Sequence, residues 1–416
     1  MLNEKLYQFG IRLYGLGIKT YARFNPKARL WIQGRANWEQ QLQEAMYRLP
    51  PEKPRIWVHV ASLGEFEQGR PVISAIHRQY PDYQIVLSFF SPSGYEVRKN
   101  YPEAAFVCYM PLDTPDNAFL FVQHLQPVMA IFIKYEFWYN HLMALEHWGI
   151  PVFLISARFR EHQIFFRPWG GFFRRLLSTF DTILIQDERS KVLLQKIGLK
   201  KVYVTGDSRV DRVLDIAANP LPFPELEKFA AGHKIIVFGS SWEPDEAIFC
   251  RWINQELPPG WKVIIAPHET GADHVQRLQQ KLKLSQTTYS QRATMNPDTQ
   301  ILIIDNVGLL AQLYQFGSIA YVGGGFGKGI HSILEPTAFG IPVITGPRYH
   351  KFEEAIALKA IGALFPIKNL ATFSRIMQTL CEDPIRKEIK VKLNGYFASQ
   401  QGATQRTLQH LASMLE

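Results

Sequence analysis

The chain has 416 residues, more than one hydrophobic core usually organises, so two domains are expected. Its 47% hydrophobic and 20% charged residues are typical of a folded globular protein and exclude a disordered or fibrous one. The formal net charge of +9 favours an anionic partner, such as nucleic acid, an acidic membrane surface or a phosphorylated substrate. Cys108, Cys250 and Cys381 are widely spaced and odd in number. They predict neither a disulfide framework nor a metal site, and they favour a reducing compartment.

Residues 4–24 are predicted to form a basic amphipathic helix. One stripe of the helical wheel is basic and consists of Lys5, Arg12, Lys19 and Arg23, and apolar and tyrosine side chains cover the opposite side. This pattern suits a helix on an anionic membrane, and it suits a helix packed on the domain equally well. The apolar runs are far short of the ~20 residues that span a bilayer. No small-residue cleavage site follows them, so a secretory signal is not expected either.

From residue 55, short apolar strands alternate with helical patterns, which indicates an α/β protein with parallel, doubly wound sheets. The strands expected in the first half are 56–60, 84–89, 105–109, 128–133, 152–155, 182–186 and 202–205. Those expected in the second half are 234–238, 262–266, 301–305, 319–322 and 343–345. Two such halves predict a cleft between them, with ligands at the carboxyl ends of the strands.

The chain is therefore expected to divide into five segments. An amphipathic segment (1–30) precedes a Rossmann-like domain (31–215). A proline-containing linker (216–232) leads to a second Rossmann-like domain (233–390), and a polar C-terminal helix (391–416) follows.

The segment 321–336 is the most informative one, because an apolar strand runs into a glycine-rich loop and then into a helix. The backbone N–H groups of such a loop can bind an anion. With Pro336 at the first helical position, Glu335 would lie at the helix mouth, where a carboxylate suits a ribose hydroxyl pair. A capping box with Ser332 as N-cap and Glu335 at N3 is the alternative. The glycine spacing matches neither a dinucleotide fingerprint nor a Walker A motif, so alone it is a weak nucleotide signal.

Other expected strand ends also carry polar or glycine-rich turns. These turns are 61–65, 91–94, 134–138, 156–158, 206–209, 239–241, 266–269 and 305–308. Each alone is explained by helix capping or by the helix dipole. Together they line one side of two facing sheets, as an enzyme of this architecture requires.

The order of these motifs resembles that of the 3-deoxy-D-manno-octulosonic acid (Kdo) transferases, over about residues 10 to 400. The motifs are His-Val-Ala-Ser-Leu-Gly-Glu65, Glu136-Phe-Trp138, Ser-Ala-Arg158, Val-Thr-Gly-Asp-Ser-Arg209, Gly-Ser-Ser241, Ala-Pro-His268, Asp-Asn-Val-Gly308, Val-Gly-Gly-Gly325, Leu-Glu-Pro336 and Gly-Ile-Pro-Val-Ile-Thr-Gly-Pro347. The resemblance implies a GT-B glycosyltransferase with two Rossmann-like domains. It implies transfer of Kdo from CMP-Kdo to a lipid A precursor (lipid IVA), with inversion and without metal or cofactor. It also implies a peripheral or N-terminally anchored protein at the cytoplasmic face of the inner membrane.

The resemblance also implies roles for individual residues. Glu65 matches the base that deprotonates the acceptor sugar, a role that suits a carboxylate whose pKa is raised by partial burial. Glu136 and Arg209 match positions that stabilise the transition state. The N-terminal domain would bind the acceptor, with Ser62, Gly64 and Arg158 on that side. The C-terminal domain would bind the donor nucleotide through Ser240, Ser241, Pro267, His268, Val307, Gly308, Leu309, Gly325, Lys328, Ser332, Ile333, Leu334 and Glu335, with Glu335 on the ribose.

Four positions depart from the family pattern. His268 stands where arginine is expected, and Leu309 stands where glutamate is expected. Ser332 replaces asparagine, and Arg209 replaces lysine with the charge kept and the geometry changed. These departures affect individual donor contacts more than the class of reaction.

Residues 158–175 interleave aromatic side chains with arginines. Such a segment can stack nucleic-acid bases, lie on a phosphorylated lipid surface, or pack its aromatics in the core. The amphipathic N-terminus favours lipid, so residues 4–24 and 159–175 are the candidate membrane contacts and no nucleic-acid partner is expected. Two alternative functions stay open: a GT-B transferase or epimerase that uses a UDP-sugar, and a non-catalytic protein that binds nucleic acid or membrane through its charge.

Overall fold

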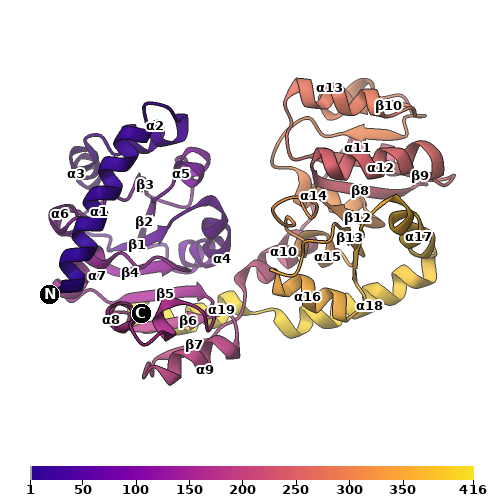
Figure 1. Ribbon diagram of the computed structural model, residues 1–416. Coiled ribbons are helices and arrows are strands. Elements are labelled where there is room, and N and C mark those ends of the chain that lie inside the picture. The colour runs from indigo at the N-terminus through magenta and orange to yellow at the C-terminus, as the bar shows by residue number, and fades with distance from the viewer. Residues whose placement is uncertain (1) are drawn as a thin grey trace. The chain divides into compact units, whose positions relative to one another are not determined.

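The computed structural model describes residues 2–416, and Met1 lies outside the described part. The chain forms two compact units (Figure 1). The first comprises residues up to Asp211 together with Gln401–Glu416, and the second comprises Arg212–Gln400. Each unit is built on a parallel sheet of seven strands, so the expected α/β class with two doubly wound halves is confirmed.

The sheet of the first unit has the strand order β3-β2-β1-β4-β5-β6-β7. The chain starts in the middle of the sheet, runs to one edge and then crosses to the other side, as in a Rossmann fold. Its strands are β1 (Arg55–Val60), β2 (Gln84–Phe89), β3 (Phe106–Tyr109), β4 (Pro127–Ile133), β5 (Val152–Ala157), β6 (Thr182–Ile185) and β7 (Val202–Val204). The main helices are α1 (Leu2–Tyr21), α2 (Pro26–Gln33), α3 (Trp38–Arg48), α4 (Leu63–Gln79), α5 (Pro92–Arg98), α6 (Pro115–Leu125), α7 (Tyr139–His147), α8 (Gly171–Ser178), α9 (Glu188–Lys196) and α19 (Ala403–Leu415).

The sheet of the second unit repeats this topology in the order β10-β11-β9-β8-β12-β13-β14. Its strands are β8 (Lys234–Ser241), β9 (Trp261–Pro267), β10 (Gln286–Thr288), β11 (Ile301–Ile303), β12 (Ile319–Val322), β13 (Val343–Thr345) and β14 (Leu364–Pro366). Its helices are α11 (Pro224–Ala230), α12 (Glu243–Glu256), α13 (Ala272–Lys281), α14 (Leu310–Leu313), α15 (Leu334–Ala338), α16 (Glu353–Ala360), α17 (Leu370–Leu380) and α18 (Asp383–Gln400). Helix α10 (Ser208–Ala218) crosses the boundary between the two units.

Two of the expected segments have a different structure from the one anticipated. Residues 216–232, expected as a linker, contain the end of α10 and helix α11, whose Leu226 and Phe229 are buried in the core of the second unit. The expected C-terminal helix is divided at Gly402, which adopts a left-handed φ of +90°. Helix α18 belongs to the second unit, whereas α19 returns to the first and packs on α4 (Figure 1).

Helix α1 confirms the predicted helix and shows two different apolar faces. Tyr7 and Tyr14, seven residues apart, contact aromatic rings of the first unit, although Tyr14 stays 44% exposed. The opposite face is open and carries Leu6, Phe9, Leu13 and Leu16, which are exposed by 60%, 66%, 58% and 62%. No helix within residues 2–416 is long and apolar enough to cross a membrane.

Candidate active site

The predicted site residues of each unit gather at one edge of its sheet. In the first unit the chain changes direction between β1 and β4, and in the second between β8 and β12. Such switch points open a crevice at the carboxyl ends of the strands, which is where α/β proteins bind ligands. Glu65 follows β1 and Glu136 follows β4, while the Ser240–Ser241 turn ends β8 and the glycine loop follows β12.

Glu65 lies in the first turn of α4 and is half-buried. Its Oε2 accepts hydrogen bonds from the backbone N–H groups of Ala61 (2.8 Å) and Ser62 (3.2 Å). Burial raises the pKa of Glu65 to about 7, and repulsion from Glu136 adds to the shift, against the two backbone bonds and the charge of Lys134. A carboxylate with this pKa can accept a proton near neutral pH, as a general base must.

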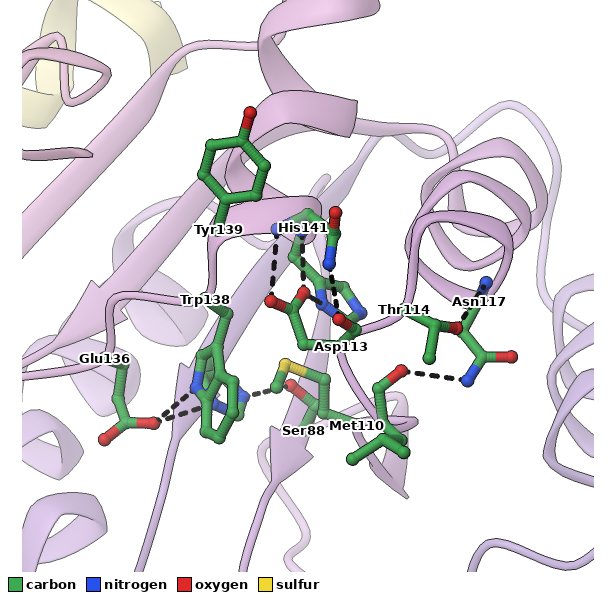
Figure 2. Close-up of polar contacts among 12 residues, drawn as sticks. Ser88, Met110, Asp113, Thr114, Asn117, Glu136, Trp138, Tyr139 and His141 are labelled. Carbon is green, nitrogen blue, oxygen red and sulfur yellow. Dashed lines mark hydrogen bonds and ion pairs between the residues drawn. The ribbon is translucent and has the colours of Figure 1, made fainter. Parts of the chain in front are cut away.

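Glu136 is buried and is held by a chain of hydrogen bonds from the sheet (Figure 2). Its Oε2 lies 2.6 Å from Trp138 Nε1 and 3.3 Å from His59 Nε2. His59 Nδ1 lies 2.8 Å from Ser88 Oγ, which also accepts the Trp57 Nε1–H at 2.7 Å. Because the Glu136 carboxylate can only accept, His59 Nε2 donates to it, and Nδ1 of the neutral ring then accepts the Ser88 hydroxyl proton.

The pKa of His59 is lowered by burial, which outweighs the effect of Glu136 and favours the neutral ring that this chain of bonds requires. The carboxylate is therefore fixed in one orientation by two neutral donors. Fixing a charge in advance in this way is how enzymes stabilise a developing charge of opposite sign.

Further charged residues stand at the same edge of the first sheet. Arg158, after β5, pairs with Asp187 at 2.9 Å. The Arg209 guanidinium makes a short ion pair with Asp207 (2.6 Å) near the start of α10. Lys134 and Ser156 adopt positive φ angles of +70° and +55° at the ends of β4 and β5. Left-handed backbone at non-glycine residues is strained and tends to occur at functional sites.

The buried carboxylate of Asp113 anchors the start of α7, which directly follows the Glu136 turn (Figure 2). Its oxygens accept the backbone N–H groups of Asn140 (3.1 Å) and His141 (2.9 Å) and contact His141 Nδ1 at 2.5 Å. The Tyr7 hydroxyl of α1 donates to the same carboxylate at 2.6 Å. Asp113 thus connects α1, β3 and the segment that carries Glu136.

We expect Asp113→Ala to lower the free energy of unfolding by about 3–5 kcal/mol, because several buried donors lose their acceptor together. Asp116→Ala is the matched control, since Asp116 is exposed at the start of α6 and should cost less than about 1 kcal/mol. Urea unfolding followed by circular dichroism measures both. Equal stability of the two variants would contradict the anchoring role of Asp113.

The candidate donor residues of the second unit come from four adjacent strands. The order β11-β9-β8-β12 brings the turn after β11, with Val307, Gly308 and Leu309, to the same edge as His268 after β9. Ser240, with a φ of +51°, and Ser241 end β8, and the glycine loop with Gly325 and Lys328 follows β12. Ser332, Lys328 and His268 are exposed, whereas the side chains of Ile333 and Leu334 are buried, so only the backbone of these two can meet a ligand.

The glycine loop is fixed by the buried carboxylate of Asp245 in α12. Asp245 accepts the N–H of Gly324 (3.0 Å) and of Trp242 (3.0 Å) and the Tyr321 hydroxyl (2.6 Å). The Gly323 N–H donates to Gly239 O at 2.9 Å. Backbone N–H groups of the loop therefore already donate to acceptors within the protein, so fewer of them can bind an anion than the sequence suggested.

The register of α15 differs from both predicted alternatives. The helix has five residues, begins at Leu334 and has Ile333 as N-cap. Glu335 and Pro336 thus occupy its second and third positions rather than the helix mouth and N1, and Ser332 is not the cap. Proline is tolerated there because the first four N–H groups of a helix have no partner in the helix.

The carboxyl edge of the second sheet also carries an aromatic stack that the sequence did not reveal. The His268 ring stacks on Trp242, with ring centroids 4.2 Å apart, and on His331 at 4.7 Å. Trp242 Nε1 donates to His331 Nε2 at 3.1 Å. His268, which departs from the family pattern, therefore stands in an ordered stack and not as an isolated loop residue.

We expect Gly323→Ala to abolish nucleotide binding and to cost about 1–3 kcal/mol of stability. A Cβ there would lie 2.3 Å from Ser240 O and 2.7 Å from Ser241 Cα, backbone atoms that cannot move aside easily. Gly395→Ala in α18 is the control, since its Cβ would meet nothing within 4 Å. Calorimetric titration with CMP measures the binding, and retained affinity in Gly323→Ala would show that the tight packing of the loop is not required.

Sequence reasoning missed His59, Trp242, Asp245 and His331, because a histidine in a buried strand or an aspartate in a helix has many structural explanations. The sequence also left the role of residues 158–175 open. Phe159 and Phe165 are buried, and Phe166, Phe172 and Phe173 pack partly buried against the same core, so the phenylalanines of this segment face inward. Arg160, Arg167 and Arg175 are exposed. Trp169 is 72% exposed and is the main outward aromatic side chain of this segment.

Within residues 2–416, no cluster of three or more His, Cys, Asp or Glu side chains could hold a metal ion.

Solved structures share this fold over most of the chain. A putative UDP-N-acetylglucosamine 2-epimerase from Listeria monocytogenes has a TM-score of 0.59 at 13% identity, covering 87% of this chain and 96% of its own. MurG from Acinetobacter baumannii has a TM-score of 0.55 at 13% identity, covering 86% of this chain and 99% of its own. Together with the two parallel sheets, these neighbours define a GT-B fold.

Sequence comparisons show which proteins the chain resembles. Residues 36–212 match the family model of the 3-deoxy-D-manno-octulosonic-acid transferases (kdotransferases). The Kdo transferase of Bordetella pertussis is 27% identical over 98% of this chain and 100% of its own length. That of Haemophilus influenzae is 26% identical over 88% of both chains. The resemblance to Kdo transferases is thus confirmed, and it indicates a glycosyltransferase.

Proposed function

We propose that this protein is an inverting, metal-independent glycosyltransferase that moves Kdo from CMP-Kdo to the lipid A precursor lipid IVA. The observation that carries the proposal is the pair Glu65 and Glu136 at the switch point of a Kdo transferase domain, with the pKa of Glu65 raised to about 7. Such a base can deprotonate a sugar hydroxyl at neutral pH.

In the proposed reaction, Glu65 takes the proton of the acceptor hydroxyl while that oxygen forms a bond to the anomeric carbon of Kdo. The bond from this carbon to the CMP phosphate breaks on the opposite face, and CMP leaves with the electron pair. Glu136, fixed by Trp138 and His59, stabilises the positive charge that develops on the sugar. Arg209 stabilises the negative charge on the phosphate. Ser62, Gly64 and Arg158 form the acceptor side.

The second unit would bind the donor nucleotide at the carboxyl edge of β8, β9, β11 and β12. The Trp242–His268–His331 stack offers a flat surface to the nucleotide, and exposed Lys328 offers a positive charge to its phosphate or to the Kdo carboxylate. Glu335 would bind the ribose. The proposed contacts are supported by the shared position of these residues at one sheet edge.

An assay of CMP release from CMP-Kdo, with and without a tetra-acylated disaccharide acceptor, tests this function. We expect release that requires the acceptor and continues in EDTA. No acceptor-dependent release would contradict the proposal. Calorimetry separates the alternative donor class, because tight binding of UDP without binding of CMP would favour a UDP-sugar enzyme.

We further propose that the open face of α1 lies on the anionic cytoplasmic surface of the inner membrane, where the acceptor is found. Leu6, Phe9, Leu13 and Leu16 form an exposed apolar row, and a stripe with exposed Lys5, Arg12 and Lys19 runs beside it. Apolar side chains enter the interface while basic ones meet lipid phosphates. The exposed Trp169 near the start of α8 is a second candidate contact.

We expect the double variant Leu6→Gln, Leu13→Gln to bind phosphatidylglycerol-containing vesicles roughly tenfold less tightly or worse, because two immersed leucines are lost. Sedimentation with vesicles measures the binding. Val391→Gln serves as the control, since Val391 is 71% exposed on α18 of the second unit. Equal binding of the double variant and the control would contradict docking through α1.

A further inference from the structure

The packed face of α1 touches the aromatic side chains that hold the catalytic turns. Tyr14 stacks on Phe90, with ring centroids 6.2 Å apart and planes at 25°. Phe90 in turn stacks on Trp138 at 4.4 Å and 30°. Trp138 donates its Nε1–H to Glu136 Oε2 at 2.6 Å. A continuous line of contacts thus runs from α1 to the carboxylate.

Phe90 is also tied to the turn that carries Glu65. Its N–H donates to Val60 O at 3.1 Å, at the end of β1, and the next N–H, of Ser91, donates to Ala61 O at 2.7 Å. Ala61 is one of the two residues whose amides bind Glu65 Oε2. Glu136 is therefore two contacts from Phe90, and Glu65 is two hydrogen bonds from its chain neighbour Ser91.

Arg35 also holds Phe90 in place. The buried Arg35 donates from Nη2 to Phe90 O at 2.7 Å and from Nε to Met110 O at 2.8 Å. Its guanidinium lies 3.8 Å from the Trp31 ring centroid and 5.0 Å from that of Phe90. These contacts hold the backbone and the ring of Phe90, and Tyr14 packs on the same ring.

A second contact from the same face of α1 reaches the other end of the Glu136 turn. The Tyr7 hydroxyl accepts the backbone N–H of Tyr139 at 3.3 Å and donates to Asp113 at 2.6 Å. Tyr139 directly follows Trp138. Tyr7 therefore reaches Trp138 through its chain neighbour Tyr139, and Tyr14 reaches it through the Phe90 ring.

We propose that α1 is a positioning element of the active site, in which Tyr14 acts on Trp138 through Phe90, Tyr7 acts on it through Tyr139, and Trp138 holds Glu136. The role given to Glu136 rests on the proposed function, whereas the contacts themselves do not. In this view the two faces of α1 have separate tasks: the open face meets lipid, and the packed face orients a carboxylate. Misplacing a positioned group by about 1 Å can cost on the order of a hundredfold in rate.

Three variants test the proposal in detergent-dispersed acceptor, where no bilayer is needed. We expect Tyr14→Ala to lower kcat on the order of tenfold with KM nearly unchanged, and Tyr14→Phe, which keeps the ring, to restore it. Tyr47→Ala is the matched control, because Tyr47 is 92% exposed on α3. Thermal melts of all three separate misplacement of Glu136 from loss of folding.

A second readout does not depend on activity. In protein labelled with 5-fluorotryptophan, the ¹⁹F resonance of Trp138, assigned by its loss in Trp138→Phe, should move in Tyr14→Ala and stay in place in Tyr47→Ala. A resonance and a kcat that both keep their wild-type values in Tyr14→Ala would overturn the proposal, and a moved resonance with unchanged kcat would overturn its catalytic part. If the wild-type protein transfers no Kdo at all, the proposed function fails, while the resonance still tests the contact.

Discussion

Replacing Glu65 with glutamine should lower kcat for transfer by about 10²–10⁴-fold, the usual contribution of a general base. Glutamine keeps the size of the side chain and can still accept the N–H groups of Ala61 and Ser62, but it cannot take a proton. The affinity for CMP should be unchanged, since Glu65 touches no proposed donor contact and the residues proposed to bind the nucleotide, from Ser240 to Glu335, belong to the second unit. Initial rates and calorimetric titration measure the two quantities.

Glu67→Gln is the control for this variant. Glu67 lies two residues further along α4 and pairs with Arg98 at 2.7 Å, away from the amides that hold Glu65. It should keep a rate within a few-fold of the wild type. A wild-type rate in Glu65→Gln would refute the assigned base and leave the fold assignment intact.

The raised pKa of Glu65 predicts two effects of pH. The rate of the wild type should fall as the pH drops below about 7, because the base becomes protonated. Stability should change in the opposite direction. The folded pKa is above the unfolded value, so protonated Glu65 stabilises the fold fully below pH 4.5, and this contribution is lost as the pH rises to about 7. Glu65→Gln should therefore become more stable than the wild type above pH 7, which denaturation at two pH values measures.

Glu136→Gln should lower kcat by about 10²–10³-fold, because a positioned charge that stabilises the transition state is lost. The same change removes the repulsion that helps to raise the pKa of Glu65. The acid limb of the pH–rate profile should therefore move to lower pH in this variant. A fall in rate without that movement would mean that the two carboxylates do not interact, and an unchanged rate would remove Glu136 from the mechanism.

The central parts of both sheets could be predicted from the sequence, because fully buried parallel strands read as short apolar runs. All the strands expected in chain order are present. The predictions missed β10 (Gln286–Thr288) and β14 (Leu364–Pro366), which have three residues each and stand at the two edges of the second sheet. Edge strands are short and half-covered, so their sequences carry little periodic signal.

The site was predictable as far as it depends on topology. Residues after β1, β4, β8 and β12 had to meet at switch points, and they do. The hydrogen-bond partners that orient Glu136 were not predictable. His59 and Ser88 lie on neighbouring strands whose buried patterns any core would share. The start of α15 was wrong in both alternatives, because proline is accepted at several positions of a first turn.

The two faces of α1 show a further limit of pattern reasoning. The helical wheel separated basic from apolar residues, but it could not divide the apolar ones into those that pack and those that stay open. That division depends on Phe90 and Asp113, which are distant in sequence and contact Tyr14 and Tyr7. The two interpretations of residues 4–24, a helix on a membrane and a helix packed on the domain, are therefore compatible, since one face packs and the other is free to meet lipid.

Mass spectrometry of the products formed from CMP-Kdo and a tetra-acylated disaccharide acceptor tests the account most directly. We predict an acceptor whose mass increases by one or more Kdo residues with the wild type and not with Glu65→Gln. An acceptor of unchanged mass with the wild type, or an equal increase with both proteins, would contradict the account.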